Sequence, residues 1–308
     1  MKPAYIISAY KRPDLLIRLV ESLGPNPISI HVDRKSGIFE GLEKSLESHS
    51  NVTFLPRHAC YWGMFGHVQA SLEGMKWFAG INSDYAILLT GQCYPLKSDA
   101  HIETALDALQ GKSVIETKRF PVADWENDCG GYKRLERFYF SVDHPIYKRL
   151  RHFDAISREV GPDEALKQVR HIRLWRRKPP LKMHPYGGSG YWCLSRQCVE
   201  YVLSFLDAHP EVQRFFSTTF IPDEMFFQTI LSNSPFKKDL INSTIHYTVW
   251  SKKSSHPAIL GVAQVPAAIA SGAWFGRKFE DIDALDHIDH LLGKSTFAKA
   301  ETPADFSK

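Results

Sequence analysis

The first half of the chain alternates apolar runs of strand length with stretches of helical periodicity, and this alternation constrains the fold more than any other feature. The apolar runs occupy residues 4–9, 28–32, 52–55 and 85–89. Between them, apolar residues recur every three or four positions, as Leu16, Leu19 and Leu23 do, which is typical of an amphipathic helix. Strands that alternate with helices form a largely parallel sheet covered on both faces. We therefore expect an α/β fold with a Rossmann-like, mostly parallel central sheet flanked by helices.

The last third of the chain resumes this pattern after an irregular interval. Expected there are strands at residues 191–194 and 245–250, and helices after Arg196, near Asp223 and at 285–292. Residues 120–182 show no clear periodicity and are basic. A chain of 308 residues suffices for one large α/β domain or for two. We expect one domain over residues 1–294, with a basic insertion at about 120–182, and a loose tail at 295–308.

The net charge of +4 is distributed unevenly along the chain. Residues 148–182 hold eleven Lys or Arg against four acidic residues, so this segment carries +7 and the remainder −3. Such a segment can attract nucleic acid, an acidic sugar polymer or the anionic headgroups of a membrane. No recognised nucleic-acid-binding module accompanies it. We therefore favour a solvated insertion or contact with a membrane surface over nucleic-acid binding.

The cysteines and the amino terminus bear on the cellular compartment. Five cysteines are scattered without a CxxC pair or a His/Cys metal spacing, which favours reduced thiols. The first residues are too soon charged for a secretory signal, and the apolar runs are shorter than a membrane span requires. We expect a cytoplasmic protein, with residues 148–182 as the candidate for peripheral contact with the inner face of a membrane.

Two adjacent carboxylates, Asp223 and Glu224, stand between Pro222 and the aromatic pair Phe226 and Phe227. Proline suits the first turn of a helix, and the apolar pattern that follows has helical spacing. Glu224 would then lie in that first turn, where the positive end of the helix favours its ionised form. A partly desolvated carboxylate on a rigid element suits a general base. The segment alone fits equally well an Asp223 that caps the helix and a Glu224 that faces water.

Three glycines, at 187, 188 and 190, directly precede the strand expected at 191–194. Because glycine has no Cβ, this backbone can approach a sugar or a phosphate closely. A tight turn into the strand explains the same residues and is the better interpretation when they are taken alone. The segment is not a phosphate-binding P-loop, because the Lys-Ser/Thr pair and the following helix are absent.

The order of several short motifs resembles one known family. The matching motifs lie between residues 4 and 290, at 4–7, 30–35, 62–63, 68–70, 88–95, 188–191, 222–224, 250, 256–257 and 275–279. In type and order they resemble the core-2/I-branching enzymes of glycosyltransferase family 14, which include β-1,6-N-acetylglucosaminyltransferases and peptide O-xylosyltransferases. The chain resembles a short, bacterial-type member.

The resemblance implies a GT-A glycosyltransferase that inverts the anomeric centre and uses neither a metal nor another cofactor. The donor would be a UDP-sugar carrying N-acetylglucosamine or xylose, and the acceptor a hydroxyl of a glycan or lipid-linked glycan. Glu224 matches the catalytic base. The other implied positions are Ala9, Lys11, Asp33, Trp62, Arg277 and Lys278 for the donor, and Glu116, Gly188, Ser189, Trp250 and Asp223 for the acceptor.

The residues themselves fit a transfer without metal. Many nucleotide-sugar enzymes hold a cation with an Asp-x-Asp motif after a strand, whereas residues 90–93 read Thr-Gly-Gln-Cys and offer no carboxylate to a hard cation. Asp281 and Asp283 match Asp-x-Asp but open the terminal helix, where a cap is the better interpretation. Arg277 and Lys278 are able to supply positive charge to the departing diphosphate instead.

Some positions depart from the family pattern, and two other function classes stay open. Cys93 stands where aspartate is common, and Lys252 follows Trp250 where some members carry an aromatic residue. One alternative is a nucleotide-sugar-binding protein without turnover. The other is a hydrolase that uses Asp223 and Glu224 as paired carboxylates. Adjacent residues on a helix point about 100° apart, which suits opposed acid and base roles poorly.

Overall fold

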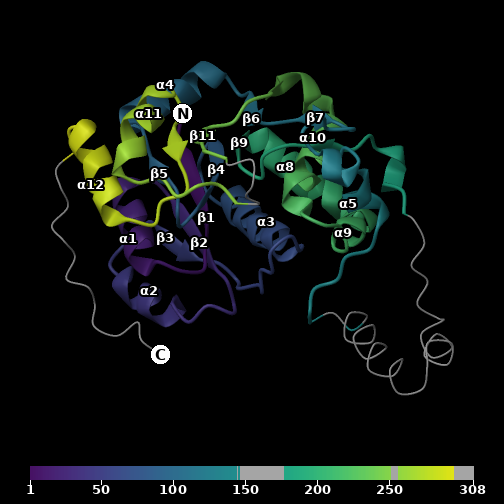
Figure 1. Ribbon diagram of the computed structural model, residues 1–308, viewed down its shortest axis with the longest axis horizontal. Coiled ribbons are helices and arrows are strands. Elements are labelled where there is room, and N and C mark those ends of the chain that lie inside the picture. Colours follow the sequence, from purple (N-terminus) through teal and green to yellow (C-terminus); the bar gives the residue numbers. More distant parts are fainter. Residues whose placement is uncertain (144, 146–176, 251–255, 295–308) are drawn as a thin grey trace.

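A seven-stranded sheet forms the centre of the computed structural model, which describes residues 1–143, 145, 177–250 and 256–294 (Figure 1). In spatial order its strands are β10 (Leu240–Ile241), β6 (Ser113–Ile115), β9 (Trp192–Ser195), β4 (Tyr85–Thr90), β1 (Pro3–Ala9), β2 (Ile28–Val32) and β3 (Val52–Phe54). All neighbouring pairs are parallel except those that β9 forms with β4 and β6. The expected mostly parallel sheet is therefore confirmed, with one antiparallel strand inserted.

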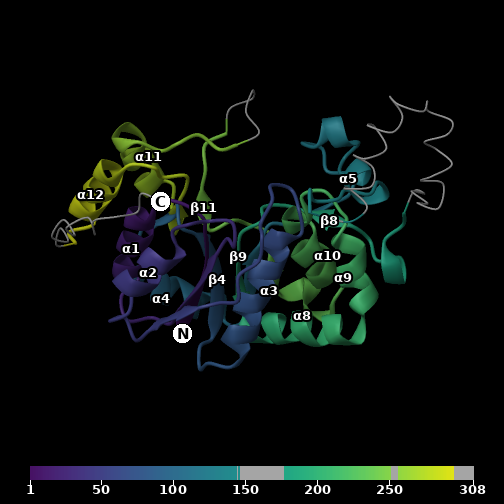
Figure 2. The ribbon, with the colours of Figure 1, turned by 90° about the horizontal axis from the view of Figure 1, so that it is seen from below.

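Alternate side chains of β1 enter two separate cores. Tyr5 and Ile7 pack on one face of the sheet, and Ala4 and Ile6 on the other. Successive side chains of a strand point to opposite faces, so each face needs its own cover of helices. One layer holds α1 (Pro13–Ser22), α2 (Phe39–Ser45), α4 (Asp99–Leu109), α11 (Val265–Ala270) and α12 (Ile282–Leu291). The other holds α3 (Gly66–Ala79), α8 (Arg196–Ala208), α9 (Pro210–Phe216) and α10 (Phe226–Ser232), and Figure 2 shows the two layers on either side of the sheet.

Two smaller sheets and several short helical elements complete the fold. A three-stranded sheet joins β11 (His246–Tyr247), β12 (Phe275–Gly276) and β5 (Tyr94–Pro95), and a two-stranded one joins β7 (Lys118–Arg119) and β8 (Tyr186–Gly187). Besides these there are a short helix, α5 (Tyr132–Glu136), and the 3-10 turns η1 (Glu126–Asp128), η2 (Pro180–Lys182), η3 (Pro222–Glu224), η4 (Pro235–Asp239) and η5 (Val262–Gln264).

The expected elements are confirmed within a few residues, except in the last third. The strand expected at 245–250 is reduced to β11 and a single bridge between Trp250 and Pro257. The helix expected near Asp223 begins at Phe226. Asp281 does cap the terminal helix, because its carboxylate accepts a hydrogen bond from the N–H of Asp283 at 3.1 Å.

Most of the basic segment at 148–182 lies outside the described residues, as does the tail at 295–308. The segment expected to contact a membrane surface therefore lies mostly outside the described residues. Residues 120–143 of the expected insertion are described, and they are more ordered than expected, because they contain α5 and η1. In the described ranges no helix has both the length and the apolar character needed to cross a bilayer.

Candidate active site

Two of the predicted donor-binding positions meet where β1 and β2 end. Ala9 is the last residue of β1, Asp33 follows β2, and the N–H of Asp33 donates to the carbonyl of Ala9 at 2.8 Å. Neighbouring parallel strands bring their carboxyl ends to the same edge of the sheet, where ligands gather in folds of this kind. The predicted proximity of these two positions is present.

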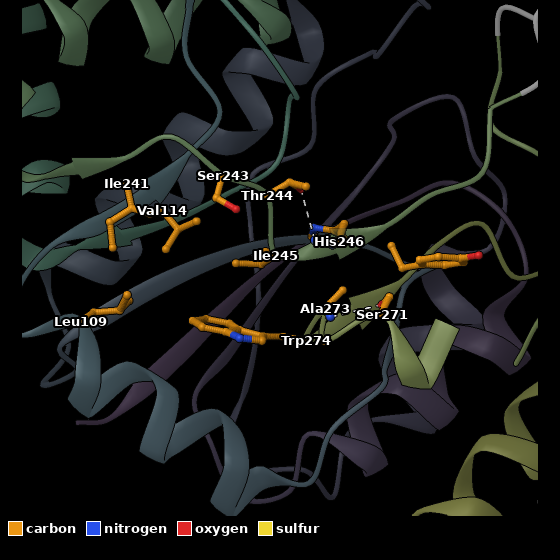
Figure 3. A pocket seen from close by; sticks show the side chains of 12 residues that line it. Leu109, Val114, Ile241, Ser243, Thr244, Ile245, His246, Ser271, Ala273 and Trp274 are labelled. Carbon is orange, nitrogen blue, oxygen red and sulfur yellow. Dashed lines mark hydrogen bonds between the residues drawn. The ribbon is translucent and has the colours of Figure 1, made fainter. Parts of the chain in front are cut away.

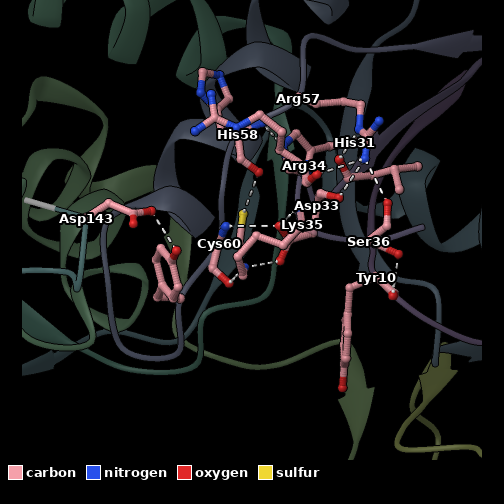
Figure 4. Close-up of polar contacts among 12 residues, drawn as sticks. Tyr10, His31, Asp33, Arg34, Lys35, Ser36, Arg57, His58, Cys60 and Asp143 are labelled. Atoms are coloured by element: carbon pink, nitrogen blue, oxygen red, sulfur yellow. Dashed lines mark hydrogen bonds and ion pairs between the residues drawn. The ribbon is translucent and has the colours of Figure 1, made fainter. Parts of the chain in front are cut away.

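The Asp33 carboxylate is held between the turn after β2 and the loop after β3 (Figure 4). Lys35 donates to it from its N–H at 2.9 Å and from its ammonium at 2.6 Å, and the N–H of Cys60 lies at 3.4 Å. Burial alone would raise the pKa of Asp33, but these hydrogen bonds outweigh it and lower the pKa below its ordinary value. Asp33 is therefore ionised at neutral pH and already paired with a cation.

Lys11 and Lys278 share the carboxylate of Glu280. Oε1 of Glu280 lies 2.8 Å from Nζ of Lys11 and 2.9 Å from Nζ of Lys278, and it accepts a hydrogen bond from Gln92 at 3.0 Å. The hydrogen bonds from Lys11 and Lys278 lower the pKa of Glu280 to about 2. Two cations from opposite ends of the chain thus converge beside the end of β4.

The Arg277 guanidinium is partly buried next to Lys278. Its Cζ lies 4.6 Å from the centre of the Tyr191 ring, and that ring packs on His246 with a centroid distance of 4.7 Å. Within the part of the chain that the structure describes, Arg277 forms no ion pair and its Nε has no hydrogen-bond partner. A desolvated cation without a counter-charge is costly, so this position favours an anionic ligand.

The Glu224 carboxylate is bound on one side only. Its Oε2 accepts a hydrogen bond from Nη1 of Arg134 at 2.7 Å, whereas Oε1 has no such partner among the described residues and 30% of the side chain is exposed. Burial and the neighbouring Asp223 raise the pKa of Glu224 to about 7, against the opposing effect of Arg134. A carboxylate that exchanges its proton near neutral pH suits a general base.

The reason predicted for the charge state of Glu224 is wrong. Glu224 ends the 3-10 turn η3, and Met225, with a φ of −137°, separates it from α10. The turn forms because Ile221, with a φ of 48°, bends the chain sharply just before Pro222. Glu224 is therefore not in the first turn of α10, and its pKa is raised instead of lowered. The alternative with Asp223 as a cap also fails, because neither η3 nor α10 has a side-chain cap.

The glycine-rich segment before β9 lies directly against Glu116 and Glu224. The N–H of Gly188 donates to the carbonyl of Glu224 at 2.9 Å, and the N–H of Ser189 donates to Oε2 of Glu116 at 2.8 Å. A Cβ at Gly188 would lie 2.1 Å from the carbonyl oxygen of Glu116. The close approach of three chain segments therefore requires glycine at this position.

Gly188→Ala is expected to lower the free energy of unfolding by about 1–3 kcal/mol, because the added methyl group must displace backbone atoms. Gly261→Ala is the matched control, since a Cβ there would meet its nearest neighbour, Oε1 of Gln264, at an ordinary 3.5 Å. Urea unfolding of both variants checks this. Equal midpoints for the two variants would contradict the close contact with Glu116.

The Asp223 carboxylate lies close to the chain segment that packs on Arg277. The Asp223 carboxylate lies beside Gly190, where a Cβ would be 3.2 Å from Oδ2. Tyr191, whose ring packs on the Arg277 guanidinium, follows Gly190 in the chain. Burial and the charges of Asp33 and Asp223 together raise the pKa of Cys60 to about 12. Gly190 and Tyr191 thus link the Asp223 carboxylate to the Arg277 guanidinium through two consecutive residues.

The two tryptophans predicted for the site lie at the surface. Trp62 is 56% exposed and Trp250 is 57% exposed. The ring of Trp62 contacts Phe220 at 5.4 Å and His256 at 6.0 Å, and Trp250 bridges to Pro257, the neighbour of His256. The two tryptophans therefore belong to adjoining segments. In the described ranges neither forms a hydrogen bond or ring contact with the ionised groups above.

A hollow of about 430 Å³ lies beside Tyr191 and His246 (Figure 3). Its wall includes Leu109, Val114, Ile241 and Trp274, and none of the predicted site residues lines it. His246 lines the hollow and also packs on Tyr191. The hollow therefore adjoins the predicted site through one histidine and is not part of it.

Sequence comparison identifies the family. The family model of the core-2/I-branching enzymes matches residues 4–268. The chain belongs to the core-2/I-branching enzyme family. Human xylosyltransferase 1 is 24% identical over 230 residues, which cover 73% of this chain and 21% of that protein. Mouse β-1,3-galactosyl-O-glycosyl-glycoprotein β-1,6-N-acetylglucosaminyltransferase 4 is 27% identical over 241 residues, covering 70% of this chain and 46% of that protein. The chain spans less than half the length of either relative.

Two solved structures share a distant likeness with this core-2/I-branching enzyme. The apo form of mouse xyloside xylosyltransferase 1 has 11% identity and a TM-score of 0.36, covering 89% of this chain and 97% of that one. Staphylococcus aureus TarS 1–349 with UDP has 13% identity and a TM-score of 0.30, covering 38% and 36%. The GT-A assignment follows from family membership together with the mostly parallel sheet.

Three polar residues of the site in this core-2/I-branching enzyme were not predicted from the sequence. Arg134 lies 90 positions from its partner Glu224, in a segment without periodicity, so no local pattern indicates it. Glu280 follows the 275–279 motif directly. An acidic residue two positions after Lys278 could have indicated an ion pair. Lys35 belongs to the 30–35 motif, which gave no hint that its ammonium pairs with Asp33.

Proposed function

We propose that this chain is an inverting glycosyltransferase that moves a sugar from a UDP-sugar to a hydroxyl of a glycan acceptor, with Glu224 as general base and without a metal. The observation that carries the proposal is that, among the described residues, Glu224 has one carboxylate oxygen without a hydrogen-bond partner and a pKa of about 7. Tyr191, at the end of the glycine-rich segment, packs on Arg277, which forms no ion pair within the same residues. The names of the relatives, a xylosyltransferase and an N-acetylglucosaminyltransferase, support sugar transfer.

The donor is proposed to bind across the ends of β1, β2 and β4. Asp33, next to Ala9, accepts hydrogen bonds from the nucleoside after Lys35 gives way. The diphosphate takes the place of Glu280 as partner of Lys11 and Lys278. It also pairs with Arg277, which has no anionic partner among the described residues. Positive charge at this point stabilises the negative charge that develops on the leaving phosphate.

In the proposed reaction, Oε1 of Glu224 takes the proton of the acceptor hydroxyl. The hydroxyl oxygen then attacks the anomeric carbon, and the bond from that carbon to the diphosphate breaks, so UDP leaves with the electron pair. Attack from the face opposite to UDP inverts the anomeric configuration. Glu116, Gly188, Ser189 and Asp223 border Glu224 and are proposed to contact the acceptor, with Trp250 at the rim.

A nucleotide-release assay tests the proposed function. The protein is incubated with UDP-N-acetylglucosamine or UDP-xylose, with and without a panel of glycan acceptors, and released UDP is measured. The proposal predicts release that depends on an acceptor. Release at the same rate without an acceptor would indicate a hydrolase, and binding of UDP without release would indicate a binding protein.

Chelation is expected to leave the transfer rate unchanged. In the described ranges no group of three or more His, Cys, Asp or Glu side chains is arranged to hold a metal ion. The prediction is that excess EDTA lowers the rate less than twofold and that manganese does not raise it. Loss of activity in EDTA with recovery in manganese would contradict the proposed role of the basic residues.

A further inference from the structure

The side chain of Arg134 connects Glu224 to a rigid frame. Its Nη1 donates to Oε2 of Glu224 at 2.7 Å, its Nε donates to Oδ2 of Asp128 at 2.6 Å, and its Cζ lies 4.0 Å from the centre of the Trp125 ring. Three different contacts thus fix one guanidinium, and only 10% of the side chain is exposed. A fork of donors held in this way fixes the orientation of the carboxylate that it binds.

The frame behind Arg134 is itself packed. The Trp125 ring meets Phe120 edge to face at 5.7 Å, and a Cβ at Gly187 would lie 2.4 Å from the Trp125 ring. The carbonyl of Arg134 accepts a hydrogen bond from the N–H of Phe220, shortly before η3. Both the backbone and the side chain of Arg134 therefore tie α5 to the turn that carries the carboxylate.

The charges around Glu224 are unequal. Asp223 and Glu116 face it, and both raise the pKa of Glu224, as does burial. Lys118 lies on the far side of Glu116, at 3.2 Å from its Oε1. Among the described residues, Arg134 is the cation that forms an ion pair with Glu224. It is therefore the local group that favours the ionised carboxylate.

We propose that Arg134 is a positioning residue for the general base: it holds Oε2 of Glu224 so that Oε1 faces the acceptor, and its charge favours the ionised form. The inference rests on the proposed function, because it assigns a role relative to that base. It adds a residue that neither the sequence motifs nor the comparisons assign, and it names how the base remains active at neutral pH.

Removing the charge of Arg134 should shift the pH dependence of activity in a definite direction. A general base works when it is deprotonated, so activity rises as pH passes upward through its pKa. Removing a cation that favours the ionised form raises that pKa, by about 1–3 units for a charge at this distance. The acidic limb of kcat/KM should therefore move upward in Arg134→Gln. Activity lost at pH 6.5 to 7 should return in part at pH 9.

The test compares three arginine variants of the full chain over pH 5.5–9.5. Arg134→Gln removes the charge and keeps the size, and Arg134→Lys keeps the charge. Arg137→Gln is the matched control, because Arg137 is exposed and directly follows α5. UDP binding, measured by calorimetry, reports whether each variant is folded at the donor side. The expected result is an upward shift of one unit or more in Arg134→Gln, a smaller shift in Arg134→Lys, and none in Arg137→Gln.

The outcomes separate this inference from the proposed function. An Arg134→Gln enzyme that binds UDP and loses the same fraction of activity at every pH would overturn the role in favouring the ionised base. An unchanged rate and profile would overturn the inference altogether. If Glu224→Gln keeps normal turnover in the same assay, the proposed base itself fails, whatever Arg134 does. If Arg134→Gln does not bind UDP, Arg134→Met, which also removes the charge at similar length, supplies the profile, and an unshifted acidic limb in that variant also overturns the inference.

Discussion

Glu224→Gln is expected to lower turnover by about 10²–10⁴-fold, the range typical for the loss of a general base, while UDP binding stays near that of the parent. The amide keeps the size of the side chain but cannot take the acceptor proton. Because Arg134 donates to Oε2, the amide oxygen is able to keep that hydrogen bond, so little structural change should accompany the loss. Steady-state rates with saturating donor and acceptor, together with UDP calorimetry, measure both effects.

Asp223→Asn is the matched control for this experiment. Asp223 adjoins Glu224 in the same turn, and its charge raises the pKa of Glu224. Neutralising it should lower that pKa and cost far less turnover than the loss of the base. Near-normal turnover in Glu224→Gln, or equal losses in both variants, would remove Glu224 from the proposed role.

Lys278→Ala is expected to weaken UDP binding and to lower kcat/KM by about 10²–10³-fold, as loss of one preorganised charge donor does at a developing anion. The unliganded protein should be affected little, because the pair with Glu280 is partly exposed and such pairs contribute weakly to stability. Lys11 and Gln92 continue to satisfy Glu280 after the substitution. UDP calorimetry, steady-state kinetics and the melting temperature of the unliganded variant check these three expectations.

Lys76→Ala is the control for a lysine of similar kind away from the site, because Lys76 forms an ion pair with Glu73 on α3 at 3.1 Å. It should bind UDP as the parent does. A Lys278→Ala protein with parental UDP affinity would contradict the proposed location of the diphosphate. A lower melting temperature without a change in UDP affinity would assign Lys278 a purely structural role.

The fold was predictable because hydrophobic periodicity records which side chains face the sheet. The runs at 28–32 and 85–89 became β2 and β4 almost residue for residue, since both are buried on two faces. The direction of β9 was not predictable, because a buried strand has the same pattern whether its neighbours are parallel or antiparallel. The short elements of the last third were too brief to establish a period.

The candidate site was predictable where a motif carried it and unpredictable where it depends on contacts across the chain. Asp33, Lys278 and Glu224 were named from motifs, and the structure brings them to one edge of the sheet. The local environment of Glu224 was misjudged, because Ile221 adopts a positive φ and a 3-10 turn replaces the expected helix start. Arg134 had no local signal, since its role arises only when α5 packs against η3.

The anomeric configuration of the product tests most directly whether the chain is an inverting glycosyltransferase with Glu224 as its base. Glu224, as the proposed base, lies on the acceptor side, so the acceptor oxygen should attack opposite to the leaving UDP, in one displacement. Proton NMR of a reaction started with an α-linked UDP-sugar and a defined glycan acceptor reports the configuration of the newly formed linkage before any rearrangement. The expected product is β-linked, and the parent enzyme makes it whereas Glu224→Gln does not. An α-linked product, formed with retention, would contradict the proposed inversion.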